Sequence, residues 1–349
     1  MVEPETVTVA VDANGADLGP AEVAAGAATA AAQGVRVLLF GPADAIGEVA
    51  DGVEVVDAPV SIAKAPDPVL AVRSTPDASI VQAARAVADG RAQALVVGGS
   101  TGAALAAGLF NIKRASGIFR PALAIPIPVP GKPVTLVDVG ANAESRPEHL
   151  VQFAFMGAAL AQVVLGVDEP RVALLSNGDE AVKGTPLVLE THEKLVGSPL
   201  RFVGNVEGLD ITSGVADVIV TDGFTGNVAL KVAEGVSQTM LEAVRSAATS
   251  SLRAKLGGTL LRPSLRGLRD QIDPEGPGGA YLLGLRQLGV VPHGRFTRFG
   301  WSQAILLAAR GVSGDVVGRT HAALEAAAAL RAKGPAASSG DLTTVSSQS

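Results

Sequence analysis

The chain has 349 residues, a formal net charge of −6, 48% hydrophobic residues and only 3% aromatic residues. That length suffices to bury one large core or the cores of two lobes. The absence of cysteine excludes disulfides, thiolate metal sites and a cysteine nucleophile, and the acidic balance argues against a general nucleic-acid binder.

The first residues, MVEPET, are acidic and run directly into an apolar strand, which is not the pattern of a signal peptide. The most apolar stretch begins at Leu150 and contains Gln152 and Gln162. It is about 18 residues long, whereas a membrane-spanning helix needs about 20. We therefore expect a buried helix there and a cytoplasmic protein.

Five segments repeat one pattern, in which an apolar run is followed by a polar Gly/Asp/Asn loop and then by a helix of small residues. They begin at residues 7, 94, 135, 172 and 218. Further strands are expected at 35–40 and 53–56. Apolar strands that alternate with helices predict an α/β fold with a mostly parallel sheet and helices on both faces. Ligands bind beyond the carboxyl ends of such strands, so we expect the five loops to line one cleft.

Two segments at 126–134 and 333–349 differ from this pattern. Residues 126–134, PIPVPGKPV, predict a proline-stiffened connector or hairpin and a possible boundary between two lobes. The α/β domain is expected to cover residues 1–332. The Ser/Gly/Pro-rich tail, residues 333–349, is expected to be disordered.

In the loop that begins at Asp138, Asn142 follows a predicted strand and Pro147 predicts the first turn of a helix. His149 would lie in that turn. A catalytic role for it is one interpretation, although a single histidine in this position is more often an ordinary polar residue.

The loop SNGDEAVKGT contains Asn177, Asp179, Glu180 and Lys183. A lysine beside glycines at the end of a strand can bind phosphate oxygens as a point charge. The alternative is a solvated lysine in a charged loop. Together with the other polar loops, the segment favours phosphate binding.

Ser100 lies within GGSTG, which matches the G-x-S-x-G pattern of α/β-hydrolases between a strand and a helix. A triad would need a later acid and histidine, and His293 is available. The competing interpretation is an anion site made by backbone amides and the Ser100 and Thr101 hydroxyls at a helix N-terminus. We favour the anion site, because no oxyanion segment of the HGGG type precedes the serine.

No P-loop, no G-x-G-x-x-G dinucleotide motif and no zinc-ligand spacing occurs in the sequence. We therefore expect chemistry from anion-binding loops, with no metal and no cofactor.

Taken in order, the loops resemble those of the phosphate acyltransferases of bacterial phospholipid synthesis, the acyl-carrier-protein:phosphate acyltransferases. The resemblance runs from residue 7 to about residue 310 and is carried by several motifs: VAVDANGADLGP, GGSTGA with RPALAIPIP, DVGANAESRPEHLVQFAFMG, PRVALLSNGDEAVKGT, FVGNVEGLDI, VIVTDGFTGNVALK and GGAYLLGL with PHG. Two motifs depart from the family pattern: DANGAD stands for DAMGGD, and GGSTGA for AGNTGA, so that Ser100 replaces an asparagine.

The resemblance implies a fold related to the isocitrate and isopropylmalate dehydrogenases and to phosphotransacetylase, with two lobes around one cleft, in a homodimer. The implied reaction converts acyl carrier protein (ACP) loaded with an acyl chain, plus inorganic phosphate, into acyl phosphate and free ACP. Phosphate is already an anionic nucleophile, so it needs positioning, and the thioester carbonyl needs donors for its oxyanion.

The expected catalytic residues are Lys183, Asp222 and Asn227, with Asp222 either orienting Lys183 or accepting a proton from phosphate. The expected phosphate- or substrate-binding residues are Asp12, Ser100, Thr101, Gly102, Asn142, Asn177, Gly223 and Gly226. A phosphotransacetylase that uses a short acyl-CoA, a serine hydrolase based on Ser100, and a phosphate- or nucleotide-binding regulatory module remain as alternatives.

Residues 243–271 form a basic, partly amphipathic segment that includes Arg262, Arg266 and Arg269. Its leucines recur at spacings of three to five, and Gly257, Gly258 and Pro263 are expected to interrupt the helix. One interpretation is a helical pair with leucines in the core or a dimer interface and a solvated basic face. The other is a surface that binds acidic ACP, an anionic membrane, or both in turn.

Overall fold

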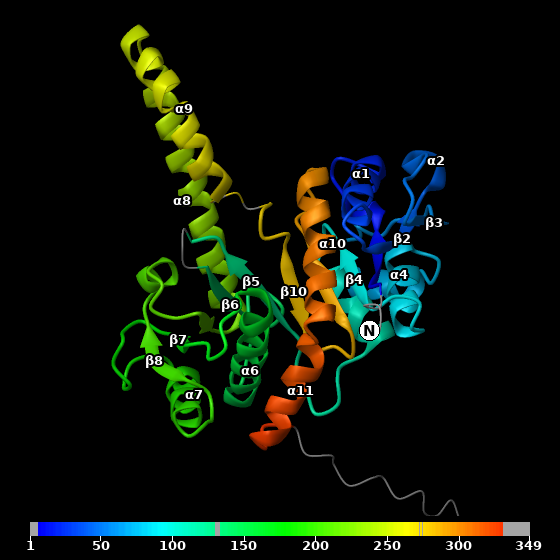
Figure 1. Ribbon diagram of the computed structural model, residues 1–349. Helices are drawn as coiled ribbons and strands as arrows, with labels where there is room; N and C mark the ends of the chain where they lie inside the picture. Colours follow the sequence, from blue (N-terminus) through cyan, green and yellow to red (C-terminus); the bar gives the residue numbers. More distant parts are fainter. Residues whose placement is uncertain (1–5, 130–132, 272, 274, 331–349) are drawn as a thin grey trace, which may run out of the picture.

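The computed structural model describes residues 6–129, 133–271, 273 and 275–330, and it shows an eleven-stranded sheet flanked by helices (Figure 1). The strands are β1 (Thr8–Asp12), β2 (Arg36–Gly41), β3 (Val53–Asp57), β4 (Ala94–Val97), β5 (Ala122–Ile127), β6 (Val134–Val137), β7 (Val172–Leu175), β8 (Phe202–Val206), β9 (Val218–Val220), β10 (Ala280–Leu283) and β11 (Leu288–Val291).

Both faces of the sheet are buried, which explains why the strands are continuous apolar runs. In β1, Val9 and Val11 belong to the core on one face and Ala10 to the core on the other. An alternating polar residue would be buried without a partner in either core, so β-branched and aliphatic side chains fill the strand.

Helices cover the two faces of the sheet. On one face lie α1 (Pro20–Ala31), α6 (Pro147–Val164), α7 (Pro186–Val196), α10 (Arg298–Ser313) and α11 (Val316–Ala326). On the other lie α3 (Pro68–Ser74), α4 (Ser79–Ala88) and α5 (Thr101–Ala107). Shorter elements are α2 (Ala43–Ile46), η1 (Ala13–Gly15), η2 (Gly108–Ile112) and η3 (Gly208–Thr212).

The strand order is β3-β2-β1-β4-β11-β10-β5-β6-β9-β7-β8. The first five strands are parallel to one another; β10 is antiparallel to both β11 and β5, so β5 runs with the first five. The direction then reverses at the antiparallel pair β5–β6, and β9, β7 and β8 are parallel to β6. Each half of the sheet therefore directs the carboxyl ends of its parallel strands the opposite way.

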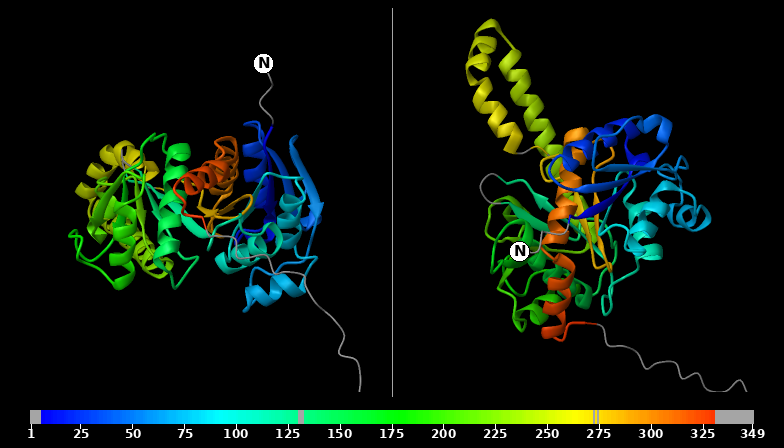
Figure 2. Two further views of the ribbon diagram at one scale, coloured as in Figure 1. Left: turned by 90° about the horizontal axis from the view of Figure 1, so that it is seen from below. Right: turned by 45° about the vertical axis from the view of Figure 1, so that its right-hand side comes forward.

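This reversal corrects the expectation that all five polar loops lie at one edge of the sheet. The loops after β1 and β4 belong to one half, and those after β6, β7 and β9 belong to the other. Residues between about 122 and 270 gather on one side of the molecule and the N-terminal strands on the other, with α10 and α11 between them (Figure 2).

Two helices project from the body as a hairpin, α8 (Gly223–Thr249) and α9 (Leu252–Gln271) (Figure 1). The expected interruption of the second helix is wrong, since α9 is continuous through Gly257, Gly258 and Pro263. The helical structure is interrupted instead at Ser250 and Ser251, in the turn between the two helices.

Most of the predicted elements are confirmed. All five segments begin with a strand, and strands occupy 36–41 and 53–57. At the two ends of the stretch 126–134, β5 and β6 pair in antiparallel fashion, as in a hairpin. The apolar stretch at 150–167 lies mostly in the buried helix α6. The strands β5, β8, β10 and β11 were not predicted. The tail, residues 333–349, lies outside the described residues, and the lobe boundary and the extent of the domain stay predictions.

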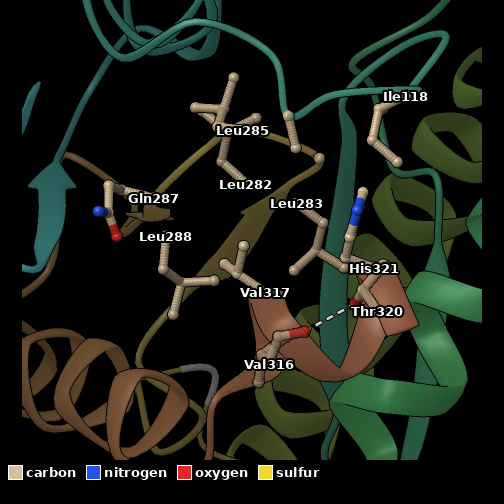
Figure 3. Close-up of a pocket in the computed structure, with 12 residues that line it drawn as sticks. Ile118, Leu282, Leu283, Leu285, Gln287, Leu288, Val316, Val317, Thr320 and His321 are labelled. Carbon is tan, nitrogen blue, oxygen red and sulfur yellow. Dashed lines mark hydrogen bonds between the residues drawn. The ribbon is translucent and has the colours of Figure 1, made fainter. Parts of the chain in front are cut away.

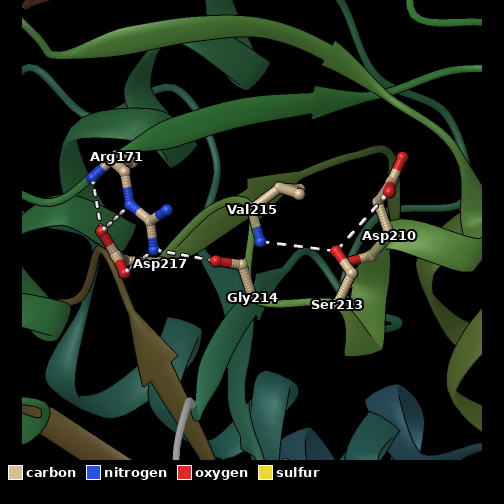
Figure 4. A network of polar contacts seen from close by, with 6 residues as sticks. All are labelled: Arg171, Asp210, Ser213, Gly214, Val215 and Asp217. Carbon is tan, nitrogen blue, oxygen red and sulfur yellow. Dashed lines mark hydrogen bonds and ion pairs between the residues drawn. The ribbon is translucent and has the colours of Figure 1, made fainter.

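One ion pair fixes the edge of the sheet where β7 and β9 begin (Figure 4). Arg171 donates to both carboxylate oxygens of Asp217, from Nε at 3.0 Å and from a terminal nitrogen at 2.8 Å, and it also donates to the Gly214 carbonyl. The hydrogen bonds from Arg171 lower the pKa of the Asp217 carboxyl. The polar loops of β7 and β9 lie at the opposite ends of these strands.

Candidate functional site: two loop clusters

The first loop cluster consists of residues 12–19, 98–101 and 292–297, which follow β1, β4 and β11. Asp12 is 3% exposed and accepts hydrogen bonds from the Ser79 hydroxyl at 2.6 Å and the Asn14 amide nitrogen at 3.2 Å. Burial raises its pKa to about 6. Asp12 thus organises the loop, and contact between its carboxylate and a phosphate would require the loop to open.

The glycines of the first cluster allow the backbone of the loop after β1 to contact the backbone of the loop after β4. A Cβ on Gly15 would lie 2.1 Å from the Gly98 carbonyl oxygen, and Gly99 has a φ of +87°. Asp17 donates its amide to the Gly294 carbonyl at 2.8 Å, which joins the loop after β11 to the same cluster. A side chain on Gly15 would separate the loops, so the glycines serve close packing.

Ser100 is the N-cap of α5, and its hydroxyl accepts the Ala103 amide at 3.3 Å. Thr101 and Gly102 form the first turn of that helix. His293 uses Nδ1 to accept the Arg295 amide at 3.3 Å, whereas a triad histidine would donate from Nδ1 to an acid. Among the described residues no histidine bonds to Ser100, so this geometry does not support the hydrolase alternative.

The second loop cluster consists of residues 138–146, 176–185 and 221–227, which follow β6, β7 and β9. Its centre is Asp138, which is fully buried. The carboxylate accepts amides from Leu123, Gly140 and Ala141 at 2.9–3.1 Å, and both the backbone amide and the side-chain Nδ2 of Asn142 at 2.9 and 2.8 Å. Burial raises the pKa of Asp138, against these hydrogen bonds.

Asn142 is buried with Asp138, and its Nδ2 also donates to the Pro121 carbonyl at 2.7 Å. Both amide protons of the side chain therefore have protein partners. In this arrangement Asn142 and Asp138 set the shape of the loop from inside, because the Asp138 carboxylate and both side-chain amide protons of Asn142 are already used within the protein.

Gly223 and Gly226 allow the start of α8 to lie against this loop. A Cβ on Gly226 would be 1.9 Å from the Asp138 carbonyl oxygen, and one on Gly223 would be 2.6 Å from the Asn142 carbonyl oxygen. The Gly223 amide donates to Asn142 and the Gly226 amide to Asp222. These amides are already used, so their predicted contact with phosphate is not formed in this geometry.

Asp222 is the N-cap of α8, where its carboxylate accepts the Thr225 amide at 2.9 Å and the Thr225 hydroxyl at 2.7 Å. Within the described chain it forms no ion pair with Lys183. The expected orientation of Lys183 by Asp222 is therefore not present. Asn227 is exposed one turn later, with its side chain beside Gly140.

Lys183 and Asn177 are exposed in the loop after β7. Asn205, at the end of β8, holds this loop by donating to the Glu180 carbonyl at 3.0 Å, and its oxygen faces His192 Nδ1 at 2.9 Å. No described carboxylate lies within 4 Å of the Lys183 ammonium. Its charge is available to an anion.

Helix α8 begins in the second cluster, and its charged side chains influence a histidine of the first. It begins at Asp222 in the second cluster, and its residue Lys231 forms an ion pair with Glu234 at 2.8 Å. Burial, and then the charges of Arg295 and Lys231, lower the pKa of His293 in the first cluster. The two clusters belong to opposite halves of the sheet, and the charge of Lys231 on α8 acts on His293 of the first cluster.

The described residues contain no group of three His, Asp or Glu side chains able to hold a metal ion. A small cavity of about 20 Å³ between the β10–β11 hairpin and α11 is lined mostly by aliphatic side chains (Figure 3). Its polar contact is internal, since the Thr320 hydroxyl donates to the Val316 carbonyl at 2.7 Å. Such a cavity has room for about one water.

A wider hollow of about 730 Å³ lies beside the first cluster, between Asn14 and α3, and is lined largely by residues 61–67. Farther away, Arg262 and Arg266 are exposed on α9, and the Arg269 side chain lies outside the described residues. No described helix is both long enough and apolar enough to cross a membrane.

Sequence reasoning missed the buried supports of both clusters. Ser79 reaches Asp12 from α4, 67 positions along the chain, and no local pattern marks it. Asp138 was noted only as a loop residue, although an acid directly after a buried strand and before Gly-Ala-Asn could have indicated a carboxylate that accepts loop amides.

Sequence similarity to known proteins indicates the family of this chain. A family described as "Fatty acid synthesis protein" matches residues 7–319. Two relatives are named "Phosphate acyltransferase": that of Gloeobacter violaceus is 42% identical over 90% of this chain and 96% of its own length, and that of Geobacillus thermodenitrificans 40% identical over 91% and 99%.

Solved structures give the same fold at greater distance. A phosphotransacetylase from Streptococcus pyogenes superposes with a TM-score of 0.59 at 16% identity, covering 88% of this chain and 94% of that one. A branched-chain phosphotransacylase from Enterococcus faecalis gives 0.54 at 18%, covering 88% and 99%. At this identity the likeness shows the fold alone. The relatives named above show more, because they match at 40% identity or higher over nearly their whole length, and this chain belongs to the phosphate acyltransferase family.

Proposed function

We propose that this protein transfers an acyl group from acyl-ACP to inorganic phosphate, and that the acyl phosphate feeds phospholipid synthesis. The observation that carries the proposal is the second loop cluster. There Asn227 is exposed, and Lys183 has no carboxylate within 4 Å among the described residues. Of the acids in the cluster, Asp138 is buried and Asp222 caps α8, whereas Glu144, Asp179 and Glu180 are exposed. This arrangement favours an anion beside the loop.

The proposed reaction needs only phosphate and the thioester. A phosphate oxygen attacks the thioester carbonyl carbon, the C–O bond forms, and the C–S bond breaks. The proton of hydrogen phosphate passes to the departing thiolate, which gives acyl phosphate and the free thiol of ACP. Lys183 would hold phosphate as a point charge, and the Asn227 amide would donate to the oxyanion. Where dihydrogen phosphate is the form that binds, Asp222 would accept its additional proton.

The other predicted binding residues take part in different ways. In the second cluster Asn142, Gly223 and Gly226 would shape the loop, while Asn177 is exposed beside Lys183. In the first cluster Asp12 and Gly102 lie within the loop framework, and the Ser100 and Thr101 hydroxyls would contact substrate across α8. This last proposal implies two lobes around one cleft, as in the dehydrogenase-like fold.

The projecting helices support the proposed partners. On α8, Val232, Val236, Met240 and Val244 are exposed at a spacing of four residues, which places them on one face. A second copy of the chain would cover this face in a homodimer. Arg262 and Arg266 of α9 would attract acidic ACP or an anionic membrane from the cytoplasm.

The test is the release of free ACP from a long-chain acyl-ACP with and without phosphate. We expect release that depends on phosphate and yields acyl phosphate in equal amount. Release of fatty acid without phosphate would support a hydrolase instead. The structural likeness to phosphotransacetylases makes acetyl-CoA the control substrate, and turnover of acetyl-CoA but not of acyl-ACP would replace the proposal by that activity.

A further inference from the structure

A cavity of about 510 Å³ lies where η2, the start of β5 and the start of α6 meet. Its lining consists of Leu109, Arg114, Phe119, Arg120, Pro121, Arg146 and His149, and we call it the arginine pocket. Three of these residues are arginines, and none is an acid. The volume falls within the range of small-molecule sites, which is about 300–1,000 Å³.

The arginines have no acidic partners. No described carboxylate lies within 4 Å of the guanidinium groups of Arg114, Arg120 or Arg146. Arg114 donates to the Phe119 carbonyl, which holds its side chain at the pocket. Three exposed arginines around a pocket with no acid in its lining, in a chain whose net charge is −6, create a local positive potential that favours an anion.

His149 adds a fixed donor to the same pocket. It is 9% exposed, and its Nδ1 accepts the Arg146 amide at 3.2 Å. The proton of the neutral ring is therefore on Nε2, which has no hydrogen-bond partner among the described residues. Burial, and then Arg120 and Arg146, lower the pKa of His149, so the ring remains neutral and donates one N–H.

The pocket adjoins the second loop cluster. Pro121, which lines it, accepts the hydrogen bond from Asn142 Nδ2 at 2.7 Å. Arg146 ends the loop that begins at Asp138 and is the N-cap of α6. An anion in the pocket would therefore be separated from the Asp138 loop by a single backbone segment.

We propose that Arg114, Arg120, Arg146 and His149 bind a phosphate group of one of the two substrates. The group is either inorganic phosphate itself or the phosphodiester on the arm that carries the acyl thioester. Planar guanidinium groups suit the oxygens of both, and the apolar Leu109 and Phe119 leave room for an organic arm beside the phosphate. The identity of these two substrates rests on the proposed function, whereas the anion site itself does not.

The experiment removes charge at the pocket and measures binding apart from turnover. Arg120→Gln and Arg146→Gln would be titrated calorimetrically with inorganic phosphate and, separately, with 4′-phosphopantetheine. Arg91→Gln, at an exposed arginine elsewhere, is the matched control. We expect each pocket variant to lose about tenfold or more in affinity for one of the two probes, because a hydrogen bond to a charged group contributes on that scale. Arg120→Lys should recover part of the loss.

Inorganic phosphate and the carrier arm, as the two candidate ligands, predict different binding and kinetic results. If the pocket holds inorganic phosphate, the variants bind phosphate weakly and their KM for phosphate rises, while that for acyl-ACP is unchanged. If it holds the carrier arm, 4′-phosphopantetheine binding weakens and the KM for acyl-ACP rises. Folded variants that bind both probes as the Arg91→Gln control does would overturn the proposal. Loss of probe binding in the variants, in a protein that shows no phosphate-dependent transfer, would support the pocket and refute the proposed function.

Discussion

The two loop clusters contain similar polar residues, but these residues have different roles in each. In the first, the carboxylate of Asp12 is buried against Ser79, and the Ser100 hydroxyl caps a helix. In the second, the buried acid Asp138 collects loop amides, and Lys183 and Asn227 are left exposed above it. Polar residues at strand ends therefore do not by themselves mark a ligand site. The distinguishing observation is a polar group without a protein partner.

The largest effect is expected where the second cluster packs most tightly. In Gly226→Ala the new Cβ would lie 1.9 Å from the Asp138 carbonyl oxygen, so the loop and α8 must separate. We expect the free energy of unfolding in urea to fall by about 4 kcal/mol or more. Gly235→Ala is the control on the same helix, since its Cβ would meet nothing within 4 Å. Equal stability of the two variants would show that the start of α8 does not pack tightly against the Asp138 loop.

A pH effect should identify the buried acid of the first cluster. Burial raises the pKa of Asp12 from 3.8 to about 6, so the folded state binds its proton more tightly than the unfolded state. The stability from this proton is fully present below pH 3.8 and is lost as the pH rises through 6. The loss corresponds to about 3 kcal/mol.

Asp12→Asn removes this titration but keeps an oxygen that can accept from Ser79. The free energy of unfolding of the variant, relative to the native protein, should therefore increase between pH 4 and pH 7. Unfolding curves in urea at several pH values measure this difference. Parallel stability profiles for the two proteins would show that Asp12 does not titrate in this window.

Removing the charge of Lys183 from the second cluster should reduce turnover without unfolding the protein. Lys183→Ala is expected to lower phosphate-dependent turnover by roughly 100-fold, which is the scale found when a hydrogen-bond donor to an anion is removed from an active site. Lys194→Ala is the control, because that lysine is paired with Glu148 and Glu190. A folded Lys183→Ala enzyme with near-normal turnover would remove this residue from the proposed site.

A smaller effect is expected at Ser100. Its hydroxyl accepts a single 3.3 Å hydrogen bond at the start of α5, so Ser100→Ala should cost about 1 kcal/mol of stability and leave most of the turnover. Thermal unfolding and the ACP-release assay measure the two quantities. Complete loss of turnover in a folded variant would indicate that Ser100 acts as a nucleophile. The first cluster would then be the catalytic one.

The smallest effect is expected on the projecting helices. Reversing Arg262, Arg266 and Arg269 to Glu should raise the KM for acyl-ACP or weaken binding to anionic liposomes, more clearly at low salt. If the folded triple variant keeps both properties, the basic segment is structural, and its leucines serve only a core or a dimer interface.

The sequence predicted the elements better than their arrangement. Apolar runs such as VTVAVD identified β1 because both faces of that strand are buried. The reversal at β5–β6 could not be predicted, since a parallel and an antiparallel neighbour bury the same apolar side chains. In the same way the composition of DGFTGN marked a tight turn. That its glycines serve close contact with the Asp138 loop depends on residues about 85 positions away along the chain.

The most direct test of the account follows the oxygen atoms of phosphate. Long-chain acyl-ACP would be incubated with phosphate labelled with ¹⁸O at all four positions, and the products analysed by mass spectrometry. Direct attack by phosphate predicts acyl phosphate that retains all four labelled oxygens, with an unlabelled carbonyl oxygen and free ACP in equal amount. Unlabelled fatty acid as the first product would show that water attacks the thioester, and would contradict the proposed role of the second loop cluster.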